Sequence, residues 1–207
     1  MLEDWKRLVE VHRDLQGDIQ TACRLQWKIV RAFPSDLEMI EKLIRLAREA
    51  GQLEECAEEL ELLTDGLDGE TRRSVLIRTA ELLDEDLQRT ARALELYERA
   101  MLEGNEDNKL YREALRKRAF SLSRQTGRQE DAIDAFQALV ELEPFEPTTY
   151  RGLKNLRSDL NNSARERIVG QILKTLNCKT TVEEVRQKTI PSRAFGDDIL
   201  EDVLAPE

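Results

Sequence analysis

The basic residues between Tyr111 and Arg128 have the most evident capacity for chemistry. Six positive side chains stand there against the single acidic Glu113: Arg112, Arg116, Lys117, Arg118, Arg124 and Arg128. Guanidinium groups bind carboxylates through paired hydrogen bonds. With Phe120 as an apolar floor, the segment is predicted to bind an acidic peptide. A solvated helix face explains the same run of charges and is the alternative.

Few other groups could support a reaction. His12 is the only histidine, and its place in an apolar helical stripe indicates packing rather than acid–base or metal chemistry. No second His or Cys lies at metal-ligand spacing, and no Gly-rich phosphate loop occurs. We therefore predict no catalysis, no cofactor, no metal and no small-molecule substrate. An enzyme of unknown type is the remote alternative.

Charge and apolar content restrict the partner and the compartment. The 207 residues carry a net charge of −10, which argues against nucleic acid as the main partner because phosphate binding needs a basic face. No segment has the roughly 18 apolar residues of a membrane span, and charges from Glu3 onward argue against a signal peptide. Three distant cysteines, Cys23, Cys56 and Cys178, are typical of reduced thiols. The sequence thus predicts a cytoplasmic protein without membrane insertion.

Apolar spacing predicts the elements that position these groups. Apolar residues three and four apart form one stripe on a helix, and Gly17 and Gly51, 34 residues apart, each fall between two such stripes. A glycine there ends the first helix of a pair, because it adopts a left-handed backbone at little cost. Ala22 and Cys56, also 34 residues apart, open the second helices, and Pro34 follows the first pair.

Three further helix pairs follow with looser spacing. The small residues early in their second helices are Ala93, Ala132 and Ala164. The fourth pair is the clearest, with a turn and second helix from Gly127 to Pro144. The third pair has residues 83–87 (LDEDL) instead of a turn glycine. The fifth has Asn161 and Asn162, and asparagine tolerates the same left-handed backbone.

This pattern resembles the tetratricopeptide repeat family. The matching features are a large residue opening the first helix (Trp5, Tyr150), Gly-Asp or Gly-Arg at the turn, a small residue early in the second helix, and a proline after it. The resemblance covers residues 3–176. It implies an all-α, right-handed helical-hairpin repeat solenoid of about five pairs, with residues 1–176 as the repeat domain. The irregular pairs also permit related helical-hairpin repeats or an antiparallel bundle.

The resemblance further implies that the first helices of the pairs line a concave face that binds peptides or helices. Residues just off the packing stripe of these helices would face the ligand. Together with the basic segment they give the predicted partner-binding set: Arg45, Arg48, Arg78, Arg112, Arg116, Phe120, Arg124, Arg151 and Asn155. The second helix of the second pair is acidic by contrast, with five glutamates between residues 54 and 61.

The C-terminal part departs from the repeat. Residues 177–190 are predicted to form a short capping helix, because a hydroxyl cap precedes early carboxylates. Residues 191–207 are an acidic amphipathic tail whose large apolar residues are Phe195, Ile199, Leu200, Val203 and Leu204. The tail either frays, finishes the core as an edge helix, or docks as a ligand in this protein's own groove, in cis or in trans, or in a partner.

These features predict a scaffold or adaptor that binds a peptide or helix of a partner protein on the face of the first helices. The expected ligand is an acidic amphipathic segment. The alternative is a structural or regulatory repeat fragment of a larger multidomain protein.

Overall fold

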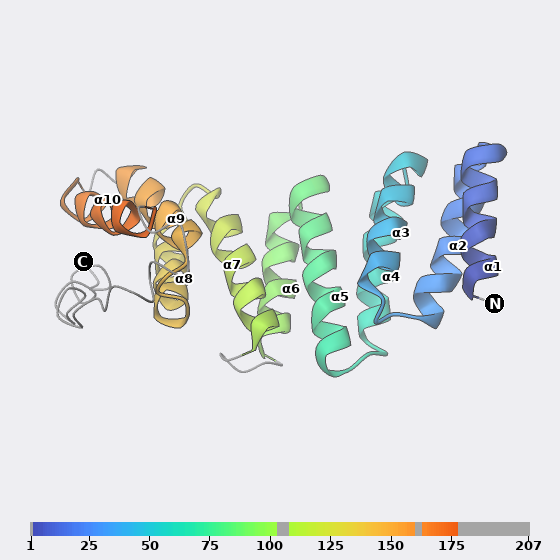
Figure 1. Cartoon of the computed structure of the whole chain (residues 1–207), viewed down its shortest axis with the longest axis horizontal. Helices are drawn as coiled ribbons and strands as arrows, with labels where there is room; N and C mark the ends of the chain where they lie inside the picture. The colour runs from blue at the N-terminus through green and yellow to red at the C-terminus, as the bar shows by residue number, and fades with distance from the viewer. Residues whose placement is uncertain (1, 103–107, 160–162, 178–207) are drawn as a thin grey trace. The chain divides into compact units, whose positions relative to one another are not determined.

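The computed structural model describes residues 2–102, 108–159 and 163–177, and these residues form ten α-helices without a strand. The helices are α1 (Leu2–Glu10), α2 (Ile19–Ala32), α3 (Leu37–Ala50), α4 (Leu53–Thr64), α5 (Gly69–Glu81), α6 (Thr90–Leu102), α7 (Lys109–Ser123), α8 (Gln129–Leu142), α9 (Pro147–Asp159) and α10 (Ser163–Asn177). Two π-helical turns, η1 (Val11–Leu15) and η2 (Leu82–Asp86), follow α1 and α5. The five predicted helix pairs and the all-α class are confirmed (Figure 1).

Two predicted features lie outside the described residues. One is the C-terminal region beyond Asn177, which holds the rest of the capping helix and the whole tail with Phe195, Ile199, Leu200, Val203 and Leu204. The other is the Asn161–Asn162 turn of the fifth pair.

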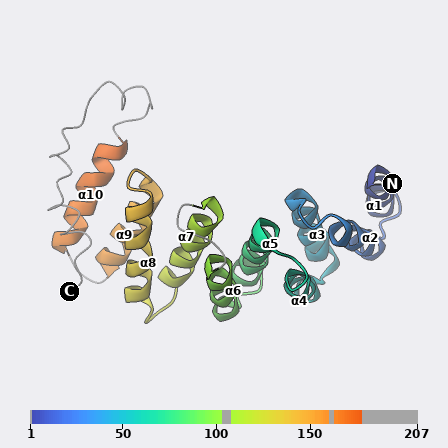
Figure 2. The same cartoon turned by 90° about the horizontal axis from the view of Figure 1, so that it is seen from below.

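The helices group into two compact units, Met1–Ala114 and Leu115–Glu207, and the boundary falls within α7. In the first unit each helix from α1 to α5 packs on the next one along the chain. Figure 2 shows α3 and α5 on one side of this unit and α4 and α6 on the other. First helices of successive pairs are thus neighbours, and so are second helices.

Small residues early in the second helices allow this close packing. Ala22, Cys56 and Ala93 are buried in the core of the first unit, and Ala132 is buried in the second. The side chain of Ala164 is not among those described. A methyl or thiol group at these four positions lets the facing helix approach closely.

The turn glycines adopt the predicted left-handed backbone. Gly17, Gly51 and Gly127 have φ angles of 67°, 71° and 86°. The third pair, which lacks the glycine, has Gln88 at the same place with φ 56°. A side chain in this region costs about 1–2 kcal/mol, so Gln88 maintains the turn at the expense of strain.

The turns of the first and third pairs share one hydrogen-bond pattern. The backbone N–H of Asp18 donates to the carbonyl of His12 at 2.8 Å, and that of Arg89 donates to the carbonyl of Leu83 at 2.7 Å. Each bond spans six residues and lies next to a π-type bond that spans five, from the N–H of Gln16 to the carbonyl of Val11 or from the N–H of Leu87 to the carbonyl of Leu82. The segment 83–87 is therefore a second copy of the first turn, although its sequence shows no glycine.

Candidate functional site

A pocket of about 240 Å³ opens on the first unit between the first helices of the second and third pairs. Three elements contribute its lining: α3, α5 and the turn η2. The lining residues are Glu41, Ile44, Arg45, Arg78, Glu81, Leu82, Glu85 and Asp86. Ile44 is half-buried and Leu82 is buried, so aliphatic side chains form a floor beneath a charged rim. We call this the α3–α5 pocket.

Three predicted site residues meet at this pocket. Arg45 and Arg78 line it. Arg48 lies at its edge, because its guanidinium binds the lining residue Asp86 with an Nη2–Oδ2 distance of 2.6 Å. The structure therefore brings together these three arginines of the predicted set in the first unit.

Two of the three arginines are already neutralised by carboxylates of the chain itself. Arg78 pairs with Glu81 at 2.6 Å, with Glu113 at 3.7 Å and with Glu41 at 3.9 Å. Arg48 is held by Asp86, whose hydrogen bonds raise the pKa of the guanidinium. These two side chains are anchored in the protein, and an acidic ligand would have to displace a carboxylate to bind them.

Arg45 and Glu85 differ from the other charged lining residues. Both side chains are exposed, and within the described part of the chain neither forms an ion pair. Each presents an unneutralised charge at the pocket rim. They are the groups that a ligand could engage without breaking an existing contact.

The basic segment of α7 also has internal partners. In the second unit the guanidinium of Arg116 pairs with Glu143, which follows α8. Next to this pair, a hydrogen bond from Thr148 lowers the pKa of Glu146, and the charges of Arg116 and Arg151 lower it further. Glu143 and Glu146 thus lie near Arg116, and the acidic-ligand site on this segment stays a prediction.

Phe120 packs inside the second unit. Its ring meets Phe136 edge to face, with centroids 5.0 Å apart and an interplanar angle of 84°. Phe136 is fully buried and touches Gly152 of α9 so closely that a methyl group there would lie 2.4 Å from the ring. Phe120 thus supports the junction of α7, α8 and α9 while part of its surface stays accessible.

The remaining predicted residues are spread over the chain. Arg112 is half-buried on α7, and Arg124 is exposed just after that helix. Both interact with other groups of the chain. Arg151 and Asn155 are exposed on α9.

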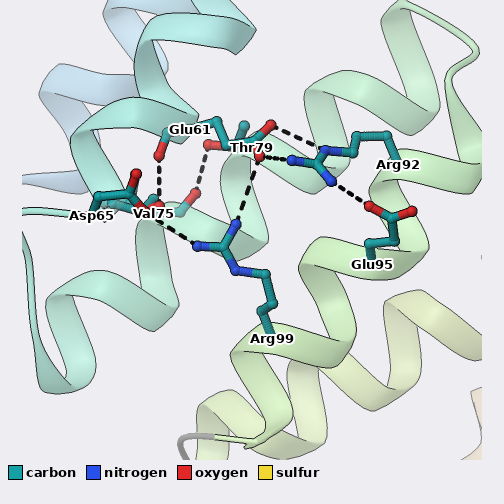
Figure 3. A network of polar contacts seen from close by, with 8 residues as sticks. Glu61, Asp65, Val75, Thr79, Arg92, Glu95 and Arg99 are labelled. Carbon is teal, nitrogen blue, oxygen red and sulfur yellow. Dashed lines mark hydrogen bonds and ion pairs between the residues drawn. The ribbon is translucent and has the colours of Figure 1, made fainter.

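The acidic second helix of the second pair has a structural role. Glu59 of α4 binds Arg31 of α2 at 2.5 Å, and Glu54 binds Arg89 at 2.5 Å. Figure 3 shows Glu61 between Arg92 and Arg99 of α6. Ion pairs thus join neighbouring second helices, so most of this acidic run specifies how the pairs stack and does not point to a ligand.

Sequence reasoning missed two carboxylates of the α3–α5 pocket. Glu85 and Asp86 come from η2, and the segment that contains them was considered only as a departure from the glycine turn. The signal was present in the segment LDEDL. A turn of the π-helical kind directs these carboxylates beside α3, and the hydrophobic spacing alone does not predict a π-turn.

Among the described residues, His, Cys, Asp and Glu do not gather in groups of three that could hold a metal ion. None of the described helices combines the length and the apolar character that crossing a membrane requires. His12 is half-buried in η1, and its Nδ1 is buried without a hydrogen-bond partner in the described part of the chain.

Solved structures share this fold at low sequence identity. A crystal structure of MamA protein aligns with a TM-score of 0.61 and 16% identity over 92% of this chain and 98% of that one. A putative kinesin light chain from Podosopora anserina with nearly identical TPR-like repeats aligns with a TM-score of 0.61 and 16% identity over 87% and 97%. MamA from Desulfovibrio magneticus RS-1 aligns with a TM-score of 0.57 and 13% identity over 84% and 92%.

No protein-family model matches the sequence, and no curated protein does. The structural likeness establishes the fold: the chain is an all-α, helical-hairpin repeat solenoid of the tetratricopeptide type, as the sequence predicted.

Proposed function

We propose that this chain is a non-catalytic protein-interaction module that binds a segment of a partner protein at the α3–α5 pocket. The observation that carries the proposal is the pocket itself, in which an aliphatic floor of Ile44 and Leu82 lies beneath unpaired charged groups. Apolar contacts buried at such a floor supply affinity, and the charged rim supplies specificity. The fold-level likeness to repeat proteins agrees with an interaction role.

The size of the pocket supports a peptide ligand over a small molecule. Sites for small molecules usually enclose about 300–1,000 Å³ and bury most of the ligand. A pocket of about 240 Å³ accommodates one or two side chains of a longer segment. The remainder of the segment would lie along the neighbouring first helices.

Ion pairs within the chain make the arginines of α7 a weaker candidate site than the α3–α5 pocket. Arg116 would have to release Glu143, and Arg78 would have to release Glu81, before either could bind a ligand carboxylate. Arg45 needs no such exchange and can donate to a carbonyl or a carboxylate of the ligand. Binding of an acidic segment at α7 stays a prediction, and so does docking of this protein's own acidic tail.

A selection from a random peptide library on phage tests the proposal. The library is passed over the immobilised full chain, over Ile44→Glu and over Leu62→Glu. Leu62 is 70% exposed on α4 and serves as the matched control, since it introduces the same charge on the opposite layer of the unit. We expect the wild type and the control to enrich the same peptides.

Loss of those peptides on Ile44→Glu would support the pocket as their site. Equal enrichment on all three proteins, or no enrichment on the wild type, would contradict the proposed function. Circular dichroism of the two variants establishes that both keep the helical fold.

A further inference from the structure

The charges around the α3–α5 pocket are unbalanced. Four carboxylates line it and two guanidinium groups do: Glu41, Glu81, Glu85 and Asp86 against Arg45 and Arg78. The difference is −2. Adding the two outer partners, Arg48 on Asp86 and Glu113 on Arg78, changes neither the balance nor its sign.

The four carboxylates of the pocket differ in how far arginines neutralise them. Glu81 and Asp86 are each engaged by a close arginine at 2.6 Å. Glu85 forms no ion pair with a described residue, and Glu41 reaches the Nε of Arg78 only at 3.9 Å. Two carboxylates of the rim therefore keep most of their capacity to accept hydrogen bonds from a cation.

The floor beneath these carboxylates is aliphatic. A lysine or arginine side chain buries its methylene stem along apolar surface while its charged head reaches polar groups. Ile44 and Leu82 offer such a surface between α3 and η2. An aspartate or glutamate of a ligand has a shorter stem and would place its charge among like charges, which is unfavourable at this range.

We propose that the α3–α5 pocket recognises a basic side chain, lysine or arginine, next to an aliphatic residue in the partner segment. This proposal rests on the proposed function and specifies its ligand. The basic head binds one of the two available carboxylates, Glu41 or Glu85, its stem packs on Ile44 and Leu82, and Arg45 donates to the ligand backbone. A net charge of −10 on the whole chain further favours the approach of a positive segment.

The same charge balance opposes this protein's own tail as the occupant. Residues 192–207 contain five acidic residues and one arginine. The pocket and the tail thus carry the same sign of charge. A segment of another protein with the opposite sign is the complementary partner.

The same library selection tests the ligand class when two double variants of the chain are added to it. Glu41→Gln/Glu85→Gln removes the two available carboxylates. Glu38→Gln/Glu58→Gln is the matched control, because both of these glutamates are exposed and form no ion pair with a described residue. The most enriched peptide is then synthesised with both ends blocked, and its affinity is measured by fluorescence anisotropy at low and at high salt.

We expect enriched peptides to carry Lys or Arg beside Leu, Ile, Val or Met. Each rim carboxylate contributes about twofold to fivefold in affinity, so the double glutamine variant should bind about fourfold to twenty-fivefold more weakly than the control. High salt should weaken binding to the wild type more than to the double variant.

Two results would overturn the inference in distinguishable ways. Enrichment that depends on Ile44 but shows acidic residues or no basic preference would overturn the ligand class and leave the proposed function standing. Enrichment that does not depend on Ile44, or no enrichment, would overturn both.

Discussion

Arg48 of α3 holds Asp86 of η2 through three hydrogen bonds, at 2.6 Å, 2.7 Å and 3.1 Å. The two residues are 38 positions apart and belong to successive helix pairs. The contact fixes the turn η2 beside α3 and thereby sets one edge of the α3–α5 pocket. Arg48, which the sequence suggested as a ligand-binding residue, thus holds two elements of the chain together.

The Arg48–Asp86 pair should contribute measurably to the stability of the first unit. Because Arg48 is about half exposed, we expect a coupling energy of about 0.5–1 kcal/mol, at the upper end for surface pairs. A double-mutant cycle with Arg48→Ala and Asp86→Ala in urea measures it. In the control cycle of Arg48→Ala with Glu58→Ala, the two effects should be additive. Additivity in the first cycle would show that the pair contributes nothing.

Gln88 is expected to be replaceable by glycine with a gain in stability. At φ 56° the side chain is strained by about 1–2 kcal/mol, while glycine loses about 0.5–1 kcal/mol more entropy on folding. Gln88→Gly should therefore raise the free energy of unfolding by up to about 1 kcal/mol, and Gly17→Gln should lower it by a similar amount. Urea unfolding of both variants provides the measurement. A loss of stability in Gln88→Gly would show that the bond from its side chain to Glu85 outweighs the strain.

The sequence predicted the fold more completely than the site. Helix pairs follow from apolar spacing, which is local, so the five pairs and three of the glycine turns were correct. Whether Arg48 is free or neutralised depends on Asp86 of η2, and Arg78 is paired with Glu41 of α3 and Glu113 of α7 as well as with Glu81 of its own helix. The ion pairs between different elements join residues distant in sequence, and the spacing of residues in a single sequence does not show which of them will pair.

Gly152 should not tolerate even one methyl group. A Cβ there would lie 2.4 Å from the buried ring of Phe136, so Gly152→Ala should destabilise the second unit by about 1–3 kcal/mol, as overpacking does. At Gly170 of α10, a Cβ atom would have no neighbour within 4 Å. Gly170→Ala should stabilise the chain by about 0.5–1 kcal/mol because alanine favours a helix. Thermal unfolding of the two variants measures both effects. Equal effects of the two substitutions would contradict the close contact between Gly152 and the ring of Phe136.

The thiol of Cys56 should make stability depend on alkaline pH. Burial raises its pKa from 9.0 to about 12, with a smaller effect of Cys23. The unfolded chain then releases this proton near pH 9 while the folded chain keeps it. The stability of the wild type should fall above about pH 9, by at most about 1.4 kcal/mol per pH unit from this group.

Urea unfolding of Cys56→Ala beside the wild type isolates this effect, because other titrating groups are common to both. The difference in stability between the two proteins should be constant below pH 9 and should shrink above it. A constant difference throughout would mean that the thiol is not shielded from solvent.

Binding of a partner segment at the α3–α5 pocket can be tested directly by methyl-labelled NMR of the full chain, with the most enriched library peptide as the titrant. Ile44 and Leu82 report on the pocket floor, and Leu62 of α4 reports on the opposite layer. We expect saturable shifts of the Ile44 and Leu82 methyl resonances and unchanged resonances of Leu62. Shifts at Leu62 without any at Ile44 and Leu82 would contradict binding at the pocket.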